Sequence, residues 1–468
     1  MNRSSSPIVS LLVFVFMMTL LIFNIQFSHP VGAGVSDVSQ RLPTNLTVDP
    51  LLYSQLAKLT ASDAAADDFF GYTVALSGDT ALVGAYGDDD GGDSSGSAYI
   101  FERNQDGANS WGQVTKLTAS DMAAYDHFGL AVALSGDTAL VGAYGGSGYS
   151  GSAYSGYSGS AYIFERNQGG SNNWGQVAKL NASDAHGGDY FGHAVSLSGD
   201  IALVGAYGDQ DGGVLSGSAY IFERNHDGSN NWGQVAKLTA SDAATFDSFG
   251  LVVSVSGDTA LVGAKWDNEG GDSSGSAYIF ERNQGGSNYW GQVVKLTASD
   301  AELADLFGSA VSLSGDTALV GAYGDDYSRG SAYIFERNQG GSNNWGQVAK
   351  LAASDAASAD FFGDAAFLSG DIALVGAYGD DDGGTASGSA YIFERNQGGS
   401  NNWGQVAKLI AGDAAAQNHF GRAVSLSGDI ALVGAQWDDD GGTRSGSAYI
   451  FNFVEMSFTI YLPFVTKP

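Results

Sequence analysis

Short apolar runs separated by polar, glycine-rich segments extend over residues 51–453, and this pattern predicts strands. The runs combine small, β-branched and aromatic residues, which favour β-structure. In the first unit the four runs, named A to D in chain order, are residues 71–76, 80–85, 97–103 and 111–117. Ser77-Gly78-Asp79 suits a tight hairpin between A and B. No run has the apolar period of a helix, so we predict four antiparallel strands in each unit.

The unit occurs seven times, at spacings of 55 to 63 residues. A Lys-Leu pair ends strand D, and its lysines are Lys58, Lys116, Lys179, Lys237, Lys295, Lys350 and Lys408. A Phe-Gly pair marks the start of strand A, at Phe70, Phe128, Phe191, Phe249, Phe307, Phe362 and Phe420. A Gly-Ala pair ends strand B, and Gly-Ser-Ala-Tyr-Ile-Phe begins strand C. Seven copies of a four-stranded antiparallel unit predict an all-β fold, a seven-bladed β-propeller.

The two ends of the repeat array predict how the ring closes. Six copies have a Trp-Gly-Gln-Val strand D, but no such strand follows Phe451 in the seventh copy. Residues 53–59 align instead with the first strand D, residues 111–117. We therefore predict that this N-terminal strand completes the seventh blade. The alternative is that a tail strand, residues 458–465, takes that place.

The segment before the repeats has the features of a secretory signal peptide. Arg3 precedes an apolar run at residues 8–23, and Val31-Gly32-Ala33 then supplies the small residues of a cleavage site after Ala33. We predict a signal peptide at residues 1–33, a linker at 34–50, the propeller at 51–453 and a short apolar tail at 454–468. An uncleaved membrane anchor is the alternative. No later run is long enough to span a bilayer, so we expect a secreted or cell-surface monomer.

Composition removes several classes of function. The 51 acidic and 20 basic residues give a formal net charge of −31. Such a charge repels phosphate backbones, so we expect no nucleic-acid partner. Cysteine is absent, which excludes disulfides, thiolate catalysis and cysteine-ligated metals. Hydrophobic residues make up 44% of the chain, which is enough for a large core and argues against disorder.

The acids concentrate on one predicted face. The B–C and D–A connections of a propeller blade share a face, and here they contain 32 of the 51 acids, against Lys265, Arg329 and Arg444. Such a face attracts hard cations. Asp-x-Asp-Gly tracts and one Asp-x-Glu-Gly tract in the B–C loops predict calcium ligands at Asp88, Asp90, Asp209, Asp211, Asp267, Glu269, Asp380, Asp382, Asp438 and Asp440. The alternative is a solvated acidic face, and loop 145–159 of the second copy, which has no acid, favours it.

The Phe-Gly and Gly-Ala tracts make the chain similar to the FG-GAP repeat family, which includes the integrin α-chain propeller and many bacterial secreted proteins. The resemblance covers residues 51–453 and implies the propeller fold and, less specifically, adhesion or recognition outside the cell. The chain departs from the family where tyrosine, lysine or glutamine replaces the proline after Gly-Ala. Its A–B connection is also too short for the integrin-type calcium loop. Calcium ligands are therefore not transferred from the family by position.

No catalytic constellation stands out in the sequence. The blades are nearly identical, whereas catalysis on one substrate needs unlike residues that converge. Lys265, Trp266 and Trp437 interrupt the repeat, and we interpret them as a candidate binding patch, with neutral drift as the alternative. We predict a non-enzymatic binding or adhesion propeller with a Ca²⁺-binding face and an extracellular protein or polysaccharide as its ligand. The alternatives are a Ca²⁺-dependent hydrolase of an anionic substrate and a scaffold without a specific ligand.

Overall fold

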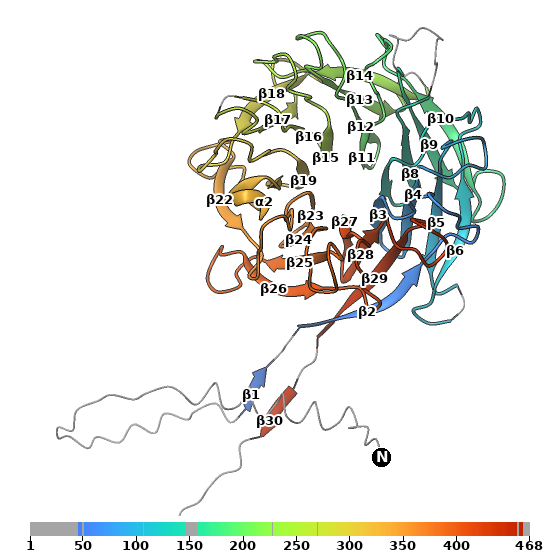
Figure 1. Cartoon of the computed structure of the whole chain (residues 1–468). Coiled ribbons are helices and arrows are strands. Elements are labelled where there is room, and N and C mark those ends of the chain that lie inside the picture. The colour runs from blue at the N-terminus through green and yellow to red at the C-terminus, as the bar shows by residue number, and fades with distance from the viewer. Residues whose placement is uncertain are drawn as a thin grey trace, which may run out of the picture. The chain divides into compact units, whose positions relative to one another are not determined.

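The computed structural model describes residues 45–48, 51–105, 107–146, 157–226, 228–268, 270–455 and 458–461. Seven four-stranded antiparallel sheets surround a common centre as blades (Figure 1). The predicted all-β, seven-bladed propeller is therefore confirmed. Pro50–Met456 form this compact unit, and a second unit contains β1 (Asn45–Val48) paired with β30 (Phe458–Tyr461). The predicted signal peptide at residues 1–33 lies outside the described residues.

Each blade runs from the centre outward through strands A to D. The innermost strands are β3 (Thr73–Ser77), β7 (Ala131–Ser135), β11 (Ala194–Ser198), β15 (Val252–Ser256), β19 (Ala310–Ser314), β23 (Ala365–Ser369) and β27 (Phe420–Ser427). The second strands are β4 (Thr80–Ala85), β8 (Thr138–Ala143), β12 (Ile201–Ala206), β16 (Thr259–Ala264), β20 (Thr317–Ala322), β24 (Ile372–Ala377) and β28 (Ile430–Ala435). The third strands are β5 (Ser97–Arg103), β9 (Ser160–Arg166), β13 (Ser218–Arg224), β17 (Ser276–Arg282), β21 (Ser331–Glu336), β25 (Ser389–Glu394) and β29 (Ser447–Glu455). The outermost strands are β6 (Trp111–Leu117), β10 (Trp174–Leu180), β14 (Trp232–Leu238), β18 (Trp290–Leu296), β22 (Gly346–Leu351), β26 (Gly404–Leu409) and β2 (Leu51–Leu59).

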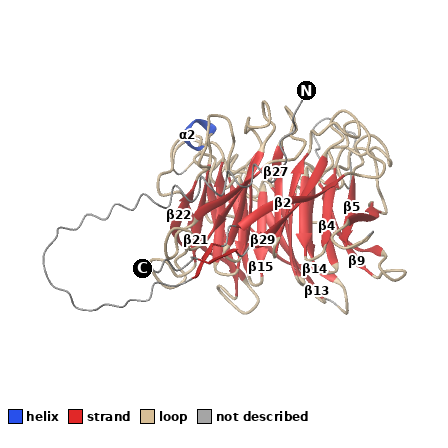
Figure 2. Cartoon of the chain, turned by 90° about the horizontal axis from the view of Figure 1, so that it is seen from below, coloured by secondary structure: helices blue, strands red, loops and turns tan. Residues whose placement is uncertain are grey.

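Connections between strands lie at both edges of the propeller (Figure 2). One of them contains α2 (Asp325–Ser328), a four-residue turn in which Asp326 and Tyr327 have positive φ. Across the described residues, no helix has the length and apolar character needed to cross a bilayer.

The seventh blade joins the two ends of the array. Its strand order is β2-β29-β28-β27, and β2 pairs antiparallel with β29 from Leu51 opposite Glu455 to Leu59 opposite Ala448. This confirms the predicted closing strand. The alternative of a tail strand in that position is wrong, because β30 pairs with β1. A strand D must end in a buried leucine, and Leu59 fills that place in the core between blades 7 and 1.

The Phe-Gly and Gly-Ala tracts pack neighbouring blades against each other. Phe128 is fully buried, its ring contacts that of Tyr162 at a tilt of 59°, and its N–H donates to the Ser95 carbonyl of the preceding blade at 3.0 Å. Gly84 has no room for a side chain, since a Cβ there would lie 1.9 Å from the carbonyl oxygen of Gly129 in the next blade. The core consequently consists of clusters between neighbouring blades.

At the edge formed by the A–B and C–D connections, arginines link neighbouring blades. Arg224 Nη2 lies 3.1 Å from Glu165 Oε1 of the preceding blade, and its guanidinium stacks on Trp232. The equivalent pairs are Arg166–Glu102, Arg282–Glu223, Arg337–Glu281 and Arg395–Glu336. The seventh copy has Asn452 and Phe453 at the glutamate and arginine positions, so Glu394 receives a hydrogen bond from Tyr53 instead of facing an arginine.

We expect Glu165→Gln to lower the free energy of unfolding by about 1–3 kcal/mol, between the values typical of an exposed and of a buried ion pair. The substitution removes the charge that Arg224 faces and leaves the packing unchanged. Urea denaturation would measure the loss. Glu394→Gln is the matched control, because no arginine pairs with Glu394 among the described residues, and it should have a smaller effect. Equal losses in the two variants would contradict the role of the inter-blade pair.

Candidate functional site

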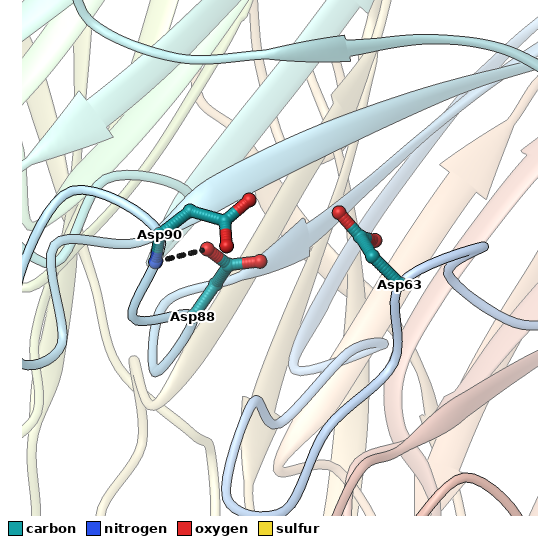
Figure 3. Close-up of side chains that lie close together, drawn as sticks. All are labelled: Asp63, Asp88 and Asp90. Atoms are coloured by element: carbon teal, nitrogen blue, oxygen red, sulfur yellow. Dashed lines mark hydrogen bonds between the residues drawn. The ribbon is translucent and has the colours of Figure 1, made fainter.

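The predicted calcium ligands of the first blade lie close together. Asp63, in the connection before β3, meets Asp88 and Asp90 from the β4–β5 loop (Figure 3). One carboxylate oxygen from each residue lies within 4.8 Å of the others. Asp88 is buried: its Oδ1 accepts the N–H of Asp90 at 3.1 Å, and its Oδ2 accepts the hydroxyl of Tyr99 at 2.7 Å. The B–C and D–A connections therefore share one face, as predicted.

A lysine of the same blade lies at the centre of this carboxylate cluster. Lys116 Nζ, from β6, is 2.8 Å from Asp63, 2.7 Å from Asp88 and 2.6 Å from Asp90. Burial alone would lower the pKa of Lys116, but hydrogen bonds to the three carboxylates outweigh it and raise the pKa. Burial would also raise the pKa of Asp63, yet its hydrogen bonds from Lys116 and Tyr99 lower it. The ammonium thus supplies the positive charge that the carboxylates require.

The same arrangement recurs in three other blades. The triads are Asp184, Asp209 and Asp211 around Lys237; Asp355, Asp380 and Asp382 around Lys408; and Asp413, Asp438 and Asp440 around Lys58. In the seventh blade the lysine is on the closing strand β2, so this cluster also joins the two ends of the ring.

Two of the other blades depart from the pattern, and in the fourth blade one member of the predicted cluster lies outside the described residues. Lys295 pairs with Asp242 and Asp267, and the predicted ligand Glu269 lies outside the described residues. Lys350 pairs with Asp300 and Asp325. In the second blade, whose B–C loop has no acid, Lys179 pairs with Asp121. The lysine is thus common to all seven blades, whereas the number of carboxylates around it varies.

This geometry does not fit a calcium ion while the lysine stays in place. Calcium binds oxygen ligands at about 2.3–2.6 Å. The Lys58 and Lys116 ammonium groups lie 2.5–3.1 Å from the same oxygens, so ion and ammonium would overlap. Calcium binding therefore stays a prediction, and it requires the lysine to withdraw. Counting charges in the B–C and D–A connections alone missed these lysines, because they belong to strand D. The sequence did contain a signal for them, because one Lys-Leu pair recurs in each copy with the same spacing as the aspartates.

A second set of aspartates stands two residues before the Phe-Gly pair in six of the copies and is buried. Asp68 is 4% exposed, and its Oδ2 accepts the N–H of Ala65 at 2.7 Å. Burial, supported by the charge of Asp88 and opposed by the Ala65 hydrogen bond, raises the pKa of Asp68 to about 6. Burial also raises the pKa values of the equivalent residues Asp126, Asp189, Asp247, Asp305 and Asp360. The seventh blade has Asn418 at this position, and its Nδ2 donates to Asp438 Oδ2 at 3.2 Å.

We expect Asp68→Asn, which copies the asparagine of the seventh blade, to stabilise the protein at pH 7.5 by on the order of 1–2 kcal/mol. The folded-state pKa of Asp68 lies above the ordinary 3.8, so the ionised residue costs stability above pH 6. This cost is lost as the pH falls through 6 toward 4, because the folded protein takes up the proton. The advantage of the variant should therefore shrink on acidification. Denaturation of both proteins between pH 7.5 and 4.5 measures the difference. An advantage independent of pH would contradict the prediction.

At the same edge the inner strands enclose a cavity of about 470 Å³, which we call the channel cup. Its rim consists of the residue after each Phe-Gly pair: Tyr72, Leu130, His193, Leu251, Ser309, Asp364 and Arg422. Alanine and valine side chains of the same strands, such as Ala131 and Val132, line its wall. Six residue types thus occupy one position of seven nearly identical blades. The blades differ chemically at this rim.

Charged groups of the channel cup come from three blades. Arg422 forms an ion pair with Asp364, and its guanidinium lies 5.3 Å from the ring centroid of Tyr72 and 5.6 Å from that of Tyr378. Lys265 lines the cup and lies near the ring of Trp266. Burial lowers the pKa of His193 to about 4, so this imidazole is neutral at pH 7.

The structure brings together only part of the predicted binding patch. Lys265 Nζ lies 5.4 Å from the ring centroid of Trp266. Trp437 lies in the seventh blade and stacks on His419, with ring centroids 4.1 Å apart. No contact joins Trp437 to Lys265 or Trp266 within the described part of the chain. Sequence reasoning did not place His193 and Asp364 in the same cavity as Lys265, although both stand at the position after Phe-Gly that varies between copies.

The family comparison agrees with the geometry. The FG-GAP repeat matches seven segments: residues 53–101, 111–164, 174–222, 232–280, 290–335, 345–393 and 403–451. These segments cover most of the chain, which therefore belongs to the FG-GAP repeat family. No curated protein matched the chain. FG-GAP repeats are typical of extracellular or cell-surface proteins, and a propeller of this kind is consistent with a binding domain.

Proposed function

We propose that the protein is a secreted or cell-surface adhesion propeller that binds an extracellular ligand at the channel cup and performs no chemistry of its own. The observation that supports this function most directly is the distribution of differences between blades. The packing residues of the Phe-Gly and Gly-Ala pairs and most cluster aspartates recur around the ring. The residue after Phe-Gly, in contrast, differs between blades, and these different residues meet at the rim of one cavity. Specific recognition needs such convergence, because one ligand cannot match seven identical surfaces.

The acidic clusters support a structural role more than a catalytic one. Each described triad surrounds a lysine that already neutralises part of its charge. Asp88 accepts hydrogen bonds from Lys116, Tyr99 and the Asp90 N–H, so most of the acceptor positions of its carboxylate are already used within the protein. The clusters therefore stiffen the loops that surround the channel cup. A calcium-loaded form of the face would require these lysines to move.

The test is a binding panel with the full chain immobilised. Purified extracellular proteins and polysaccharides are applied in EGTA and in CaCl₂, and the same chain is assayed for hydrolysis of phosphate esters and polysaccharides. The proposal expects saturable binding to one ligand class and no turnover. Turnover that disappears in the double variant Asp88→Asn, Asp90→Asn would instead establish the hydrolase. If the chain shows neither binding nor turnover, the scaffold without a specific ligand becomes the favoured hypothesis.

A further inference from the structure

Lys265 is an exception among the basic residues of this protein. Every other lysine and arginine within the described residues forms an ion pair with a carboxylate. Lys265 forms none with any described carboxylate, although the chain has 51 acidic residues against 20 basic ones. In a molecule with such an excess of acid, a lysine that forms no ion pair with a described carboxylate is unusual, and its surroundings need a closer description.

The position of Lys265 makes the missing counter-ion costly. Five other blades have tyrosine at this position, and the seventh has Gln436. Lys265 Nζ lies 5.4 Å from the ring centroids of both Trp266 and Tyr323, and the side chain is half-buried in the wall of the channel cup. Burial lowers its pKa, with Arg422 adding to the effect and Asp364 opposing it. The aromatic rings attract the ammonium, but they do not replace a carboxylate.

The neighbours of Lys265 leave the channel cup with one uncompensated positive charge. Asp364 is the carboxylate of the rim, and its ion pair with Arg422 neutralises it. His193 is neutral, because burial lowers its pKa to about 4. The remaining rim residues, Tyr72, Leu130, Leu251 and Ser309, are neither acidic carboxyl nor basic groups, and apart from Thr73 the wall below is alanine and valine. A ligand that fits has one negative charge on an apolar stem.

We propose that the channel cup binds a single carboxylate, an aspartate or glutamate side chain at the tip of a partner protein's loop, with Lys265 as its ion-pair partner. This rests on the proposed adhesion function and names the ligand group that the cup takes. The surrounding face has abundant carboxylates, so a polyanion such as a polyuronate chain is repelled at each of its charges, whereas one isolated carboxylate is repelled much less and gains the ion pair with Lys265. A cavity of about 470 Å³ is large enough for an acidic side chain with adjoining backbone.

The direct test uses a small probe and the full chain. N-acetylglutamate α-amide, which has one carboxylate, is titrated against the chain while the indole N–H signal of Trp266 is followed by NMR. N-acetylglutamine α-amide, its neutral isostere, is the ligand control. The proposal expects saturable millimolar binding of the carboxylate probe and at least tenfold weaker binding of the isostere. Equal binding of the two probes overturns the proposal.

Two variants separate the role of Lys265 from a general effect of charge. Lys265→Met retains the length of the side chain and should weaken binding of the carboxylate probe at least tenfold. Arg329→Met removes an exposed positive charge from the β20–β21 loop at the same edge and should leave the affinity unchanged. A thermal melt of each variant confirms that it is folded. Unchanged affinity in Lys265→Met, or an equal loss in Arg329→Met, overturns the assignment of Lys265.

The same variants distinguish this inference from the adhesion function. A protein ligand from the binding panel that binds Lys265→Met as well as the unmodified chain overturns the carboxylate cup and leaves the adhesion function intact. A carboxylate probe that binds through Lys265, in a chain that captures no protein or polysaccharide from the panel, supports the cup and overturns the adhesion function. Loss of the captured protein ligand in Lys265→Met, with retention in Arg329→Met, supports both.

Discussion

Removal of residues 51–59 should abolish cooperative folding of the propeller. These residues form β2, the outermost strand of the seventh blade, and they pair with β29 from Ala448 to Glu455. The deletion exposes the core between blades 7 and 1, where Leu59 is 2% exposed, and leaves buried Asp438 without Lys58. Loss of a buried leucine costs about 2–5 kcal/mol and an uncompensated buried charge about 3–5 kcal/mol. The two losses together are comparable to the free energy of unfolding of a typical domain, which is about 5–15 kcal/mol.

Thermal and urea denaturation, followed by tryptophan fluorescence, would measure this effect. Deletion of residues 458–468 is the matched control, because β30 pairs with β1 and with no blade. We expect that control to retain the cooperative transition of the full chain. The opposite pattern, with a stable chain lacking β2 and an unstable chain lacking the tail, would be inconsistent with closure by the N-terminal strand.

The fold was predictable because the repeat removes most of the ambiguity of strand assignment. Seven copies show the same strand boundaries, and the copy that lacks strand D shows where the ring must close. The glycines of Phe-Gly and Gly-Ala mark close backbone approaches, as at Gly84 beside Gly129 of the next blade. Strand boundaries and close backbone approaches are thus each marked by a sequence motif, and the motif recurs in every blade.

The meeting of the aspartates was also predictable, because propeller topology places the B–C and D–A connections at one edge. The lysine at their centre was not. Strand β6 has a bulge at Val114, so that Phe101 lies opposite Gln113 while Ile100 lies opposite Thr115. This register places Lys116 opposite Tyr99, whose hydroxyl contacts Asp88. A one-residue slip would turn the lysine to the other face, and period-2 alternation does not reveal a bulge.

The channel cup was missed for a different reason. Residues at its rim are separated by about one repeat in sequence and meet only when the ring closes. Lys265 and Arg422 are recognisable in the sequence as interruptions of the repeat, but their relation depends on their places around the channel. Asp364 and His193 stand at the same position after Phe-Gly, where variation between copies resembles drift until the copies are arranged around one cavity.

Lys116→Met should convert a lysine-centred cluster into a calcium-dependent one. Without the ammonium, three carboxylates repel one another around buried Asp88, and we expect a loss of about 3 kcal/mol in EGTA. The vacated position then has oxygen ligands on several sides, which suits Ca²⁺. Calcium at about 100 times its dissociation constant would restore about 2.7 kcal/mol. Thermal melts in EGTA, CaCl₂ and MgCl₂ would measure loss and recovery.

Lys179→Met is the control for this prediction, because Lys179 pairs with a single exposed carboxylate, Asp121, and the loop opposite has no acid. Its loss should not exceed about 1 kcal/mol, and calcium should not restore it. Thermal melts of the unmodified chain test calcium binding at the ligands that the sequence predicts. A Ca²⁺ ion at these ligands must displace a lysine such as Lys116, and its binding would raise the melting temperature specifically in CaCl₂. Calcium stabilisation of Lys116→Met alone would show that the lysines occupy the place of the metal, and equal effects of Ca²⁺ and Mg²⁺ would indicate charge screening.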